Sequence, residues 1–269
     1  MVRRSDNPEF IEALARGLDT IRVFQPGESS LSLSTVATRT ELARPTARRI
    51  LLTLAELGYV RIDQGMYFLT PKVLELGMAY SLSLGLWEVA APHMQKLVAF
   101  THESSSIAQL DGSDIVYVYR VAVSKIVGLR VTIGTRFPAI VTSLGKVLLA
   151  ALSAEELDLV LSIPSRSGID PKWRPGKEEI LRELTSVRAQ GWALTDEELA
   201  LGIRSVAAPL RDGTGRVIAA LNVNAHSAET SIETLTEAYL PKLLTTAAEI
   251  SADWALVSSA PQKIISNLQ

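Results

Sequence analysis

Three arginines lie within six residues at the start of ARPTARRILLTLAELGYV, residues 43–60. Arg44, Arg48 and Arg49 accompany an apolar stripe with i, i+3, i+4 and i+7 spacing, which predicts a helix with one buried face. Because the guanidinium fork pairs with phosphates and with guanine, arginines in the first turns of such a helix could bind DNA. The alternative is an ordinary solvated helix surface.

A second polar group could hold a small organic acid. In VTSLGK, Ser143 is the expected N-cap of a helix, which would leave the amides of Leu144 and Gly145 free. Free N–H groups and the helix dipole stabilise a carboxylate at such a terminus. The alternative is that Thr142 and Ser143 only cap the helix.

Two asparagines alternate with apolar residues in ALNVNA. Asn222 and Asn224 would therefore face the same side of a strand. Amides on an otherwise apolar strand need hydrogen-bond partners, which the carboxylate or hydroxyl groups of a ligand could supply. The alternative is a strand with one solvated face.

Catalytic and metal-binding motifs are missing from the sequence. The chain has no cysteine, and His93, His102 and His226 are not at metal-ligand spacing. We find no nucleophile elbow, Walker loop or dinucleotide fingerprint, and a hydrolase using Ser143 would lack an identified base. We therefore expect no catalytic residues, no metal and no cofactor.

Length and composition are those of a globular protein. The 269 residues, 47% of them hydrophobic, are enough for two domains. No apolar run approaches the roughly 18 residues of a membrane span, and the N-terminus lacks a signal-peptide core. We expect a cytoplasmic protein with no membrane partner. The net charge is −2, but residues 39–49 carry four arginines against one glutamate, so any basic surface must be local.

The order of elements in the first third of the chain is typical of one DNA-binding fold. The pattern predicts an amphipathic helix over 9–24, a short helix from Ser32 or Ser34 to about Thr40, and the helix over 43–57. The hairpin YVRI-DQG-MYFL follows. This is the order of a winged helix-turn-helix, whose second motif helix enters the major groove with its N-terminal residues.

The remainder reads as an α+β domain. A helix over about 71–85 leads into it, and strands are expected near 105–112, 115–123, 127–133, 203–210 and 217–225. Helices are expected over 142–152, 153–162, 176–191 and 231–257, the last broken at Pro241. The pattern therefore predicts an antiparallel sheet with helices on one side.

Four blocks of this sequence resemble IclR-type transcriptional regulators, over about Ala13 to Trp254. They are LSLSTVATRTELARPTARRILLTLAELGYV, LTPKVLELG, GTRFPAIVTSLGKVLLA and DEELALGIRSVAAPLRDGTGRVIAALNVNA. Within the family, RVAVSKIVGLRVTIGTRFPA is most similar to regulators of the β-ketoadipate pathway, which respond to protocatechuate, 4-hydroxybenzoate or their ring-opened products. Two features depart from the family: Pro45 stands where a hydroxyl residue is usual, and no arginine or lysine lies between Arg61 and Lys72 in the wing.

The resemblance implies two domains with different functions. Residues 1–83 would form the winged helix-turn-helix and linker helix, and 84–269 a GAF-like domain for effector binding and oligomerisation. The partners would be double-stranded operator DNA, an aromatic or dicarboxylic acid, and further copies of the chain in a homodimer or dimer of dimers. The DNA-binding residues would be Arg39, Arg44, Thr46, Arg48 and Arg49; the effector-binding residues Thr142, Ser143, Leu144, Gly145, Asp196, Ser205, Asn222 and Asn224.

Two other functions remain open at this point. The chain could be a small-molecule sensor or an enzyme whose winged helix mediates protein contacts instead of DNA binding. DNA affinity should fall steeply with salt, whereas an apolar protein contact should not.

Overall fold

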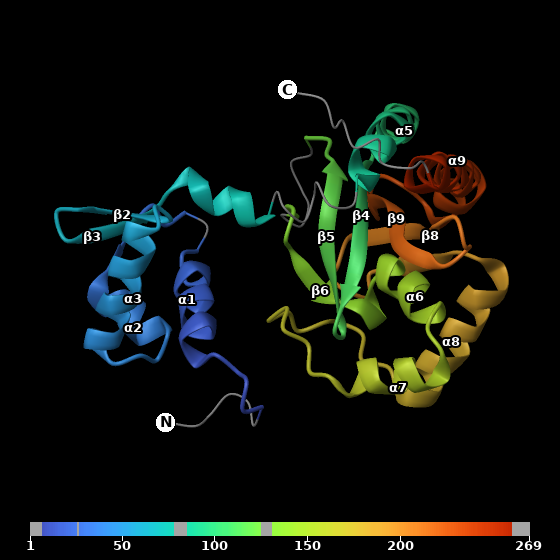
Figure 1. Cartoon of the computed structure of the whole chain (residues 1–269). Coiled ribbons are helices and arrows are strands. Elements are labelled where there is room, and N and C mark those ends of the chain that lie inside the picture. The colour runs from blue at the N-terminus through green and yellow to red at the C-terminus, as the bar shows by residue number, and fades with distance from the viewer. Residues whose placement is uncertain (1–6, 26, 78–84, 125–130, 260–269) are drawn as a thin grey trace. The chain divides into compact units, whose positions relative to one another are not determined.

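The computed structural model describes residues 7–25, 27–77, 85–124 and 131–259. The chain divides into two compact units, Met1–Leu84 and Gly85–Gln269 (Figure 1).

Before residue 70, the described part of the N-terminal unit contains three helices and a small antiparallel sheet with strand order β1-β3-β2 (Figure 1). The elements are α1 (Glu12–Arg22), β1 (Leu31–Ser32), α2 (Leu33–Arg39), α3 (Arg44–Glu56), β2 (Val60–Asp63) and β3 (Met66–Leu69). Ser32 is the N-cap of α2, because its side chain accepts from the Thr35 amide. The predicted winged helix-turn-helix is confirmed, with β1 as an additional strand that the sequence pattern did not indicate.

The buried face of α3 orients the rest of that helix. Ala47 and Leu51 are completely buried, and Leu54 is nearly so, in a core shared with Val36 of α2. The predicted stripe is wrong at its end, because Leu57 is 52% exposed. Residues on the opposite side of α3 therefore face solvent.

A two-residue turn closes the hairpin of β2 and β3. Asp63 pairs with Met66, and Gln64 and Gly65 both have positive φ angles, of 47° and 77°. Two successive positive φ values are typical of the type I′ turn, whose twist matches that of the strands. The DQG signal thus predicted this turn correctly.

The expected linker helix is seen only in part. Pro71–Val73 form a 3-10 turn capped by the Thr70 side chain, and residues 74–77 are α-helical. The rest of the predicted helix, 78–84, lies outside the described residues. Gly85, with φ of 60°, is the N-cap of the next helix.

The C-terminal unit is built on a six-stranded antiparallel sheet with strand order β6-β5-β4-β9-β8-β7. The strands are β4 (Ser104–Asp111), β5 (Asp114–Val121), β6 (Arg136–Pro138), β7 (Ala193–Asp196), β8 (Ile203–Arg211) and β9 (Val217–His226). The edge strands β6 and β7 were not predicted. The strand predicted over 127–133 is wrong at residues 131–133, which form no strand, and its other residues lie outside the described ranges.

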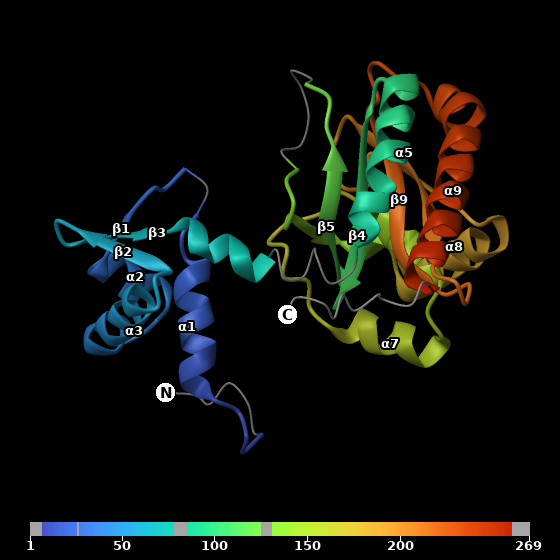
Figure 2. The ribbon, with the colours of Figure 1, turned by 45° about the horizontal axis from the view of Figure 1, so that its top comes forward.

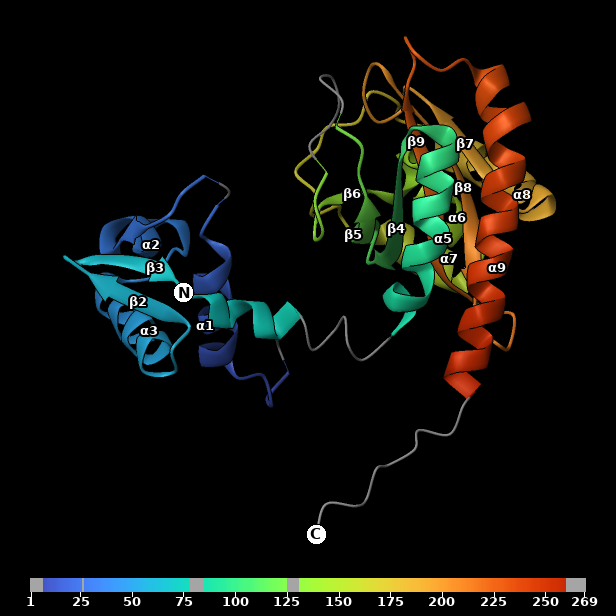
Figure 3. The same ribbon diagram turned by 90° about the horizontal axis from the view of Figure 1, so that it is seen from above.

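Helices cover both faces of this sheet, so the expectation of one covered face is wrong (Figures 2 and 3). On one face lie α5 (Leu86–Thr101) and α9 (Leu240–Ser259); on the other lie α6 (Ser143–Ala150) and α8 (Lys177–Gln190), with α7 (Ala154–Ser162) beyond them. The reason is visible in β8, where Val206, Ala207 and Ala208 are consecutive and completely buried. A continuous apolar run, without polar alternation, requires cover on both sides.

The last helix is continuous across Pro241. Thr234–Tyr239 form a π-helical stretch that passes directly into α9, and the Leu240 amide donates to the Leu235 carbonyl. Proline lacks an N–H and clashes with the carbonyl four residues earlier in a regular α-helix. The wider π turns place that carbonyl elsewhere, so the predicted break at Pro241 is wrong.

Candidate DNA-binding surface and effector pocket

The N-terminus of α3 presents three free guanidinium groups. Arg44, Arg48 and Arg49 are exposed, and within the described part of the chain none of them forms an ion pair. Ala43 is the N-cap and supplies no side-chain hydrogen bond, so the first amides of the helix are also without a side-chain cap. A helix N-terminus with uncapped amides and adjacent arginines is suited to phosphate and base-edge contacts.

Two further residues of α3 border these arginines. Thr46, which was among the expected DNA-binding residues, is half-buried in the first turn. Leu52 is 39% exposed and lies one turn beyond Arg48 and Arg49 on the same face. An exposed leucine here could contact a thymine methyl group, and sequence reasoning had assigned it no role.

Arg39 differs from the α3 arginines because its guanidinium group is already bound within the protein. It donates to both carboxylate oxygens of Glu28, at 2.5 and 2.8 Å, and to the Val23 carbonyl at 3.0 Å. The hydrogen bond from Arg39 holds the pKa of the Glu28 carboxyl below its usual range. These contacts tie α2 to the segment after α1, so a phosphate contact would have to compete with them.

The charged groups of the wing are also engaged. The Arg61 guanidinium lies 4.3 Å from the centre of the Phe68 ring and bonds to Asp63, and the Lys72 ammonium lies 5.3 Å from the Tyr59 ring. Tyr67 is buried in the core, whereas Phe68 is half-buried. The structure adds no free basic side chain to the wing.

In the C-terminal unit, a closed pocket lies between the first turn of α6 and strands β5, β7, β8 and β9. Six of the eight expected effector-binding residues line it, while Gly145 and Asp196 do not. The lining residues are Tyr117, Val141, Thr142, Ser143, Leu144, Thr195, Leu199, Ile203, Ser205, Asn222 and Asn224. Its cavity of about 20 Å³ is far below the roughly 300–1,000 Å³ of ordinary ligand sites, so an aromatic ligand requires the walls to move.

The N-cap of α6 is Thr142, so the prediction that Ser143 caps the helix is wrong. The Thr142 hydroxyl accepts from the Gly145 amide at 3.1 Å and donates to the Ala139 carbonyl at 3.2 Å. The Gly145 amide is therefore used by the cap and is not free for a ligand. Thr142 takes the cap because its own backbone is extended while Ser143 is already helical.

Ser143 and the sheet form a hydrogen-bonded polar row. The Ser205 hydroxyl donates to the Val223 carbonyl at 3.1 Å and accepts from Ser143 at 2.8 Å and from the Asn222 amide at 3.0 Å. The Asn222 side-chain oxygen accepts from the Ser106 backbone at 3.0 Å. The expectation that Asn222 needs a ligand is therefore wrong, since the protein satisfies it. Asn224, by contrast, is half-buried on the pocket wall.

Gly145 and Asp196 lie behind the pocket walls. A Cβ atom on Gly145 would come within 2.1 Å of the Ala139 carbonyl oxygen, so glycine permits α6 to pack against the 3-10 turn Ala139–Val141. Asp196 accepts from Arg204 at 2.9 Å, and Arg204 also donates to the Thr230 carbonyl. Both residues hold neighbouring segments in place.

Tyr117 forms part of the pocket wall. Its ring meets Phe137 edge to face, with centroids 5.8 Å apart. Burial raises the pKa of Tyr117 to about 12, so the hydroxyl stays protonated at neutral pH. It can therefore donate a hydrogen bond to a carboxylate or phenolic oxygen.

Arg120 extends the polar row, and sequence reasoning missed it. Its guanidinium donates to the Ser106 hydroxyl at 2.9 Å, and no ion pair of Arg120 occurs among the described residues. Burial lowers the pKa of Arg120 below its usual range, although an arginine remains charged at neutral pH. A half-buried guanidinium without a carboxylate partner is suited to bind the carboxylate of a ligand.

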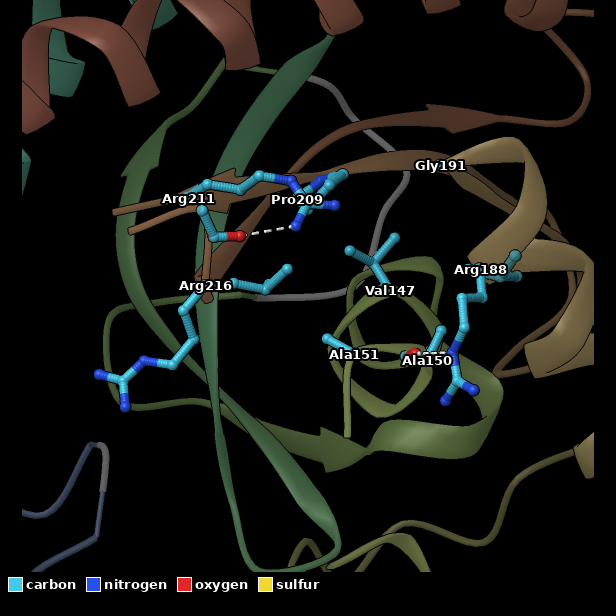
Figure 4. Close-up of a pocket in the computed structure, with 11 residues that line it drawn as sticks. Val147, Ala150, Ala151, Arg188, Gly191, Pro209, Arg211 and Arg216 are labelled. Carbon is cyan, nitrogen blue, oxygen red and sulfur yellow. Dashed lines mark hydrogen bonds between the residues drawn. The ribbon is translucent and has the colours of Figure 1, made fainter. Parts of the chain in front are cut away.

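A second, more open pocket of about 270 Å³ lies at the other end of α6 (Figure 4). None of the expected effector-binding residues lines it. Arg188 donates to the carbonyls of Ala150 and Leu152, Arg211 donates to that of Gly215, and Arg216 extends away from Arg188. Two of the three arginines therefore already cap backbone carbonyls.

A winged helix with free arginines, followed by an α+β domain with a polar, closed pocket, defines a ligand-responsive DNA-binding regulator. The family model described as IclR helix-turn-helix domain matches residues 13–64, and the one described as Bacterial transcriptional regulator IclR C-terminal matches residues 78–252. The chain therefore belongs to the IclR family of transcriptional regulators, and its sheet domain has the GAF-like fold expected of that family.

Similar proteins include regulators of aromatic catabolism. The chain is 38% identical to the Pca regulon regulatory protein of Pseudomonas putida, over 88% of this chain and 82% of the relative. A transcriptional regulator of Rhodococcus sp. RHA1 has a solved structure with 46% identity and a TM-score of 0.81, covering 92% of this chain and 100% of that one. An IclR homolog from Microbacterium hydrocarbonoxydans, solved in complex with 4-hydroxybenzoate, has 25% identity and a TM-score of 0.78, covering 91% and 99%.

Proposed function

We propose that this regulator senses a small aromatic acid, of the protocatechuate or 4-hydroxybenzoate type, and binds operator DNA through Arg44, Thr46, Arg48 and Arg49. The observation that carries the proposal is the polar row beside Arg120. It offers hydrogen-bond partners for the carboxylate and the hydroxyl group of a ligand, in a pocket that is otherwise apolar. The similarity to a Pca regulon regulator, and to a homolog bound to 4-hydroxybenzoate, supports this ligand class.

The two ends of the pocket suit the two ends of such a ligand. Arg120, through its place beside Ser106, would bind the carboxylate, while Ser143, Ser205 and Asn224 would face a ring hydroxyl. Val141, Leu144, Leu199 and Ile203 would contact the ring faces, which bury apolar area. A dicarboxylic ring-opened product would use the same polar positions with fewer ring contacts.

The other parts of the proposal follow from this activity. We propose that this protein is not an enzyme, because a regulator binds DNA and releases its ligand unchanged. We also propose that it acts in the cytoplasm. No helix among the described residues could cross a membrane. We propose a homodimer or dimer of dimers, because two recognition helices would then meet half-sites about one turn of DNA apart. The effector would favour one relative placement of these helices.

The proposal is tested by fluorescence anisotropy of a labelled duplex from upstream of the protein's own gene. The titration runs at two salt concentrations, with and without protocatechuate. We expect tight, salt-sensitive binding that protocatechuate alters. If neither protocatechuate nor 4-hydroxybenzoate changes the affinity for the duplex, the proposed ligand class is wrong. Two results together would favour a winged helix that binds protein: affinity for the duplex no higher than for a random duplex, and binding of a protein partner that does not depend on salt.

Replacing Arg120 with methionine should selectively weaken effector binding. We expect the Kd for 4-hydroxybenzoate to rise by about one to two orders of magnitude, since hydrogen bonds to charged groups contribute about 1.5–3 kcal/mol. Isothermal titration calorimetry measures this change. Arg136→Met is the matched control, because Arg136, on the edge strand β6, pairs with Asp111 and makes no hydrogen bond to Ser106, whereas Arg120 does. Equal effects of the two substitutions would contradict the role given to Arg120.

A further inference from the structure

A short loop forms part of the wall of the effector pocket. Residues 197–202 connect β7 to β8; Leu199 lies within this loop, Ile203 directly follows it, and both line the pocket. Since the cavity is only about 20 Å³, a ring can enter only if this wall moves. The contacts that hold the loop therefore govern access.

The first contacts hold the two ends of the loop together. Glu197 has a positive φ of 58°, and its carboxylate accepts from the Ser227 hydroxyl at 2.8 Å and from the Gly202 amide at 3.0 Å. Its other oxygen lies 3.7 Å from the Lys172 ammonium. These bonds close the base of the loop without fixing its middle.

Directly after Glu197, the loop is held by a buried lysine. Lys146 on α6 is 1% exposed, and its ammonium donates to both carboxylate oxygens of Glu198, at 2.7 and 2.6 Å. It also donates to Glu183 on α8 and lies 4.7 Å from the centre of the Trp173 ring. The Trp173 amide donates to the Glu198 carbonyl at 3.0 Å. We call Lys146, Glu183, Glu198 and Trp173 the Lys146 cluster.

Stability alone does not explain this arrangement. Burying an ammonium with two carboxylates carries a desolvation cost that often equals the Coulombic gain, so such clusters are weak evidence for stabilisation. Burial raises the pKa of the Glu198 carboxyl despite its lysine partner, which is the sign of that cost. What the cluster does provide is a fixed position for Glu198 relative to α6.

Lys146 stands on the helix whose first turn lines the pocket. It lies one turn after Thr142 and Ser143, which line the pocket from the start of α6. One side chain therefore connects the first turn of α6 with the loop segment next to Leu199.

We propose that Lys146 is a positioning residue that holds residues 197–202 closed over the effector pocket through Glu198, and so sets the rates of effector entry and exit. This proposal rests on the assignment of the closed pocket to the effector. Release of the Glu198 carboxylate would detach the loop from α6, while Glu197 keeps the two ends of the loop together.

A matched pair of substitutions tests this role. Glu198→Gln and Glu183→Gln each remove one carboxylate from the same ammonium, but only Glu198 belongs to the loop. Stopped-flow tryptophan fluorescence with 4-hydroxybenzoate would give the association and dissociation rates. For Glu198→Gln we expect both rates to rise by about tenfold, the scale of one charge-assisted hydrogen bond, with a smaller change in Kd. For Glu183→Gln we expect both rates to stay within about twofold of the unmodified protein.

Hydrogen exchange of the free protein separates failure of this proposal from failure of the ligand assignment. Amides 197–203 should exchange faster in Glu198→Gln than in Glu183→Gln, while exchange in α8 stays alike. Equal exchange in the two variants would overturn the role of Lys146, whatever ligand binds. Faster exchange without any binding of 4-hydroxybenzoate would support the loop's role and reject that ligand.

Discussion

Replacing Arg48 and Arg49 together with alanine is expected to lower operator affinity by about two orders of magnitude. Both guanidinium groups are exposed at the start of α3 and lack ion-pair partners among the described residues. A bidentate arginine–guanine pair contributes about 1–3 kcal/mol, and a phosphate contact adds a salt-dependent share. Fluorescence anisotropy with the operator duplex and with a random duplex measures the affinity for each.

The control is Arg22→Ala, which removes an exposed arginine from the end of α1 and should leave affinity nearly unchanged. The salt dependence distinguishes the kinds of contact: loss of a phosphate contact reduces the slope of log K against log salt by about one, and loss of a base contact does not. Weakening by Arg22→Ala as large as that of the double substitution would indicate a diffuse charge effect. It would contradict a recognition role for α3.

Gly145→Ala should destabilise the C-terminal unit by about 3 kcal/mol or more, because overpacking against a fixed backbone is costly. The new Cβ would lie 2.1 Å from the Ala139 carbonyl oxygen, 2.4 Å from its Cα and 2.5 Å from its carbonyl carbon. None of these atoms can move without displacing the turn that carries Val141 into the pocket. Urea unfolding, followed by circular dichroism, measures the loss of stability.

Gly17→Ala is the matched control for this substitution. Gly17 also lies inside a helix, but no atom lies within 4 Å of its added Cβ. There we expect a gain of up to about 1 kcal/mol from helix propensity, confined to the N-terminal unit. If Gly145→Ala behaved like Gly17→Ala, the close packing of α6 on Ala139–Val141 would not be a constraint on this protein.

The winged helix was predictable because its signals are local. Pro45 near the start of α3, Gly58 after its end and the DQG turn each specify one backbone conformation, and the apolar spacing gave the buried face. Strand β1 was missed because two residues carry no periodicity. Its pairing with β3 depends on a contact between Leu31 and Tyr67, which are far apart in the sequence.

The pocket was predictable only where a motif and a strand alternation pointed to it. Thr142, Ser143, Ser205, Asn222 and Asn224 do meet, although the protein already satisfies Asn222. Whether Asn222 would find partners in the protein depended on which strands pair with β9, and strand pairing is not encoded locally.

The side of the sheet on which Arg120 lies could not be predicted from strand alternation. Strict alternation along β5 would place Tyr117 and Arg120, three residues apart, on opposite faces. A β-bulge between Ile107 and Ala108 of the partner strand leaves Val118 as the extra residue, so both side chains share one face. The position of a bulge follows from tertiary packing, and the sequence pattern alone could not have revealed it.

Asn222 and Ser205 find their hydrogen-bond partners within the protein, and this affects how such a sensor could change during evolution. Their hydrogen bonds to Ser106 and the Val223 carbonyl are made within the protein and need no ligand. Exchange of Val141, Leu199 or Ile203 alters the shape of the wall without leaving a buried polar group unpaired. Under the proposed assignment of the effector to this pocket, a lineage, or an engineer building a biosensor, would retune ring preference at these three positions while the hydrogen-bonded residues stay unchanged.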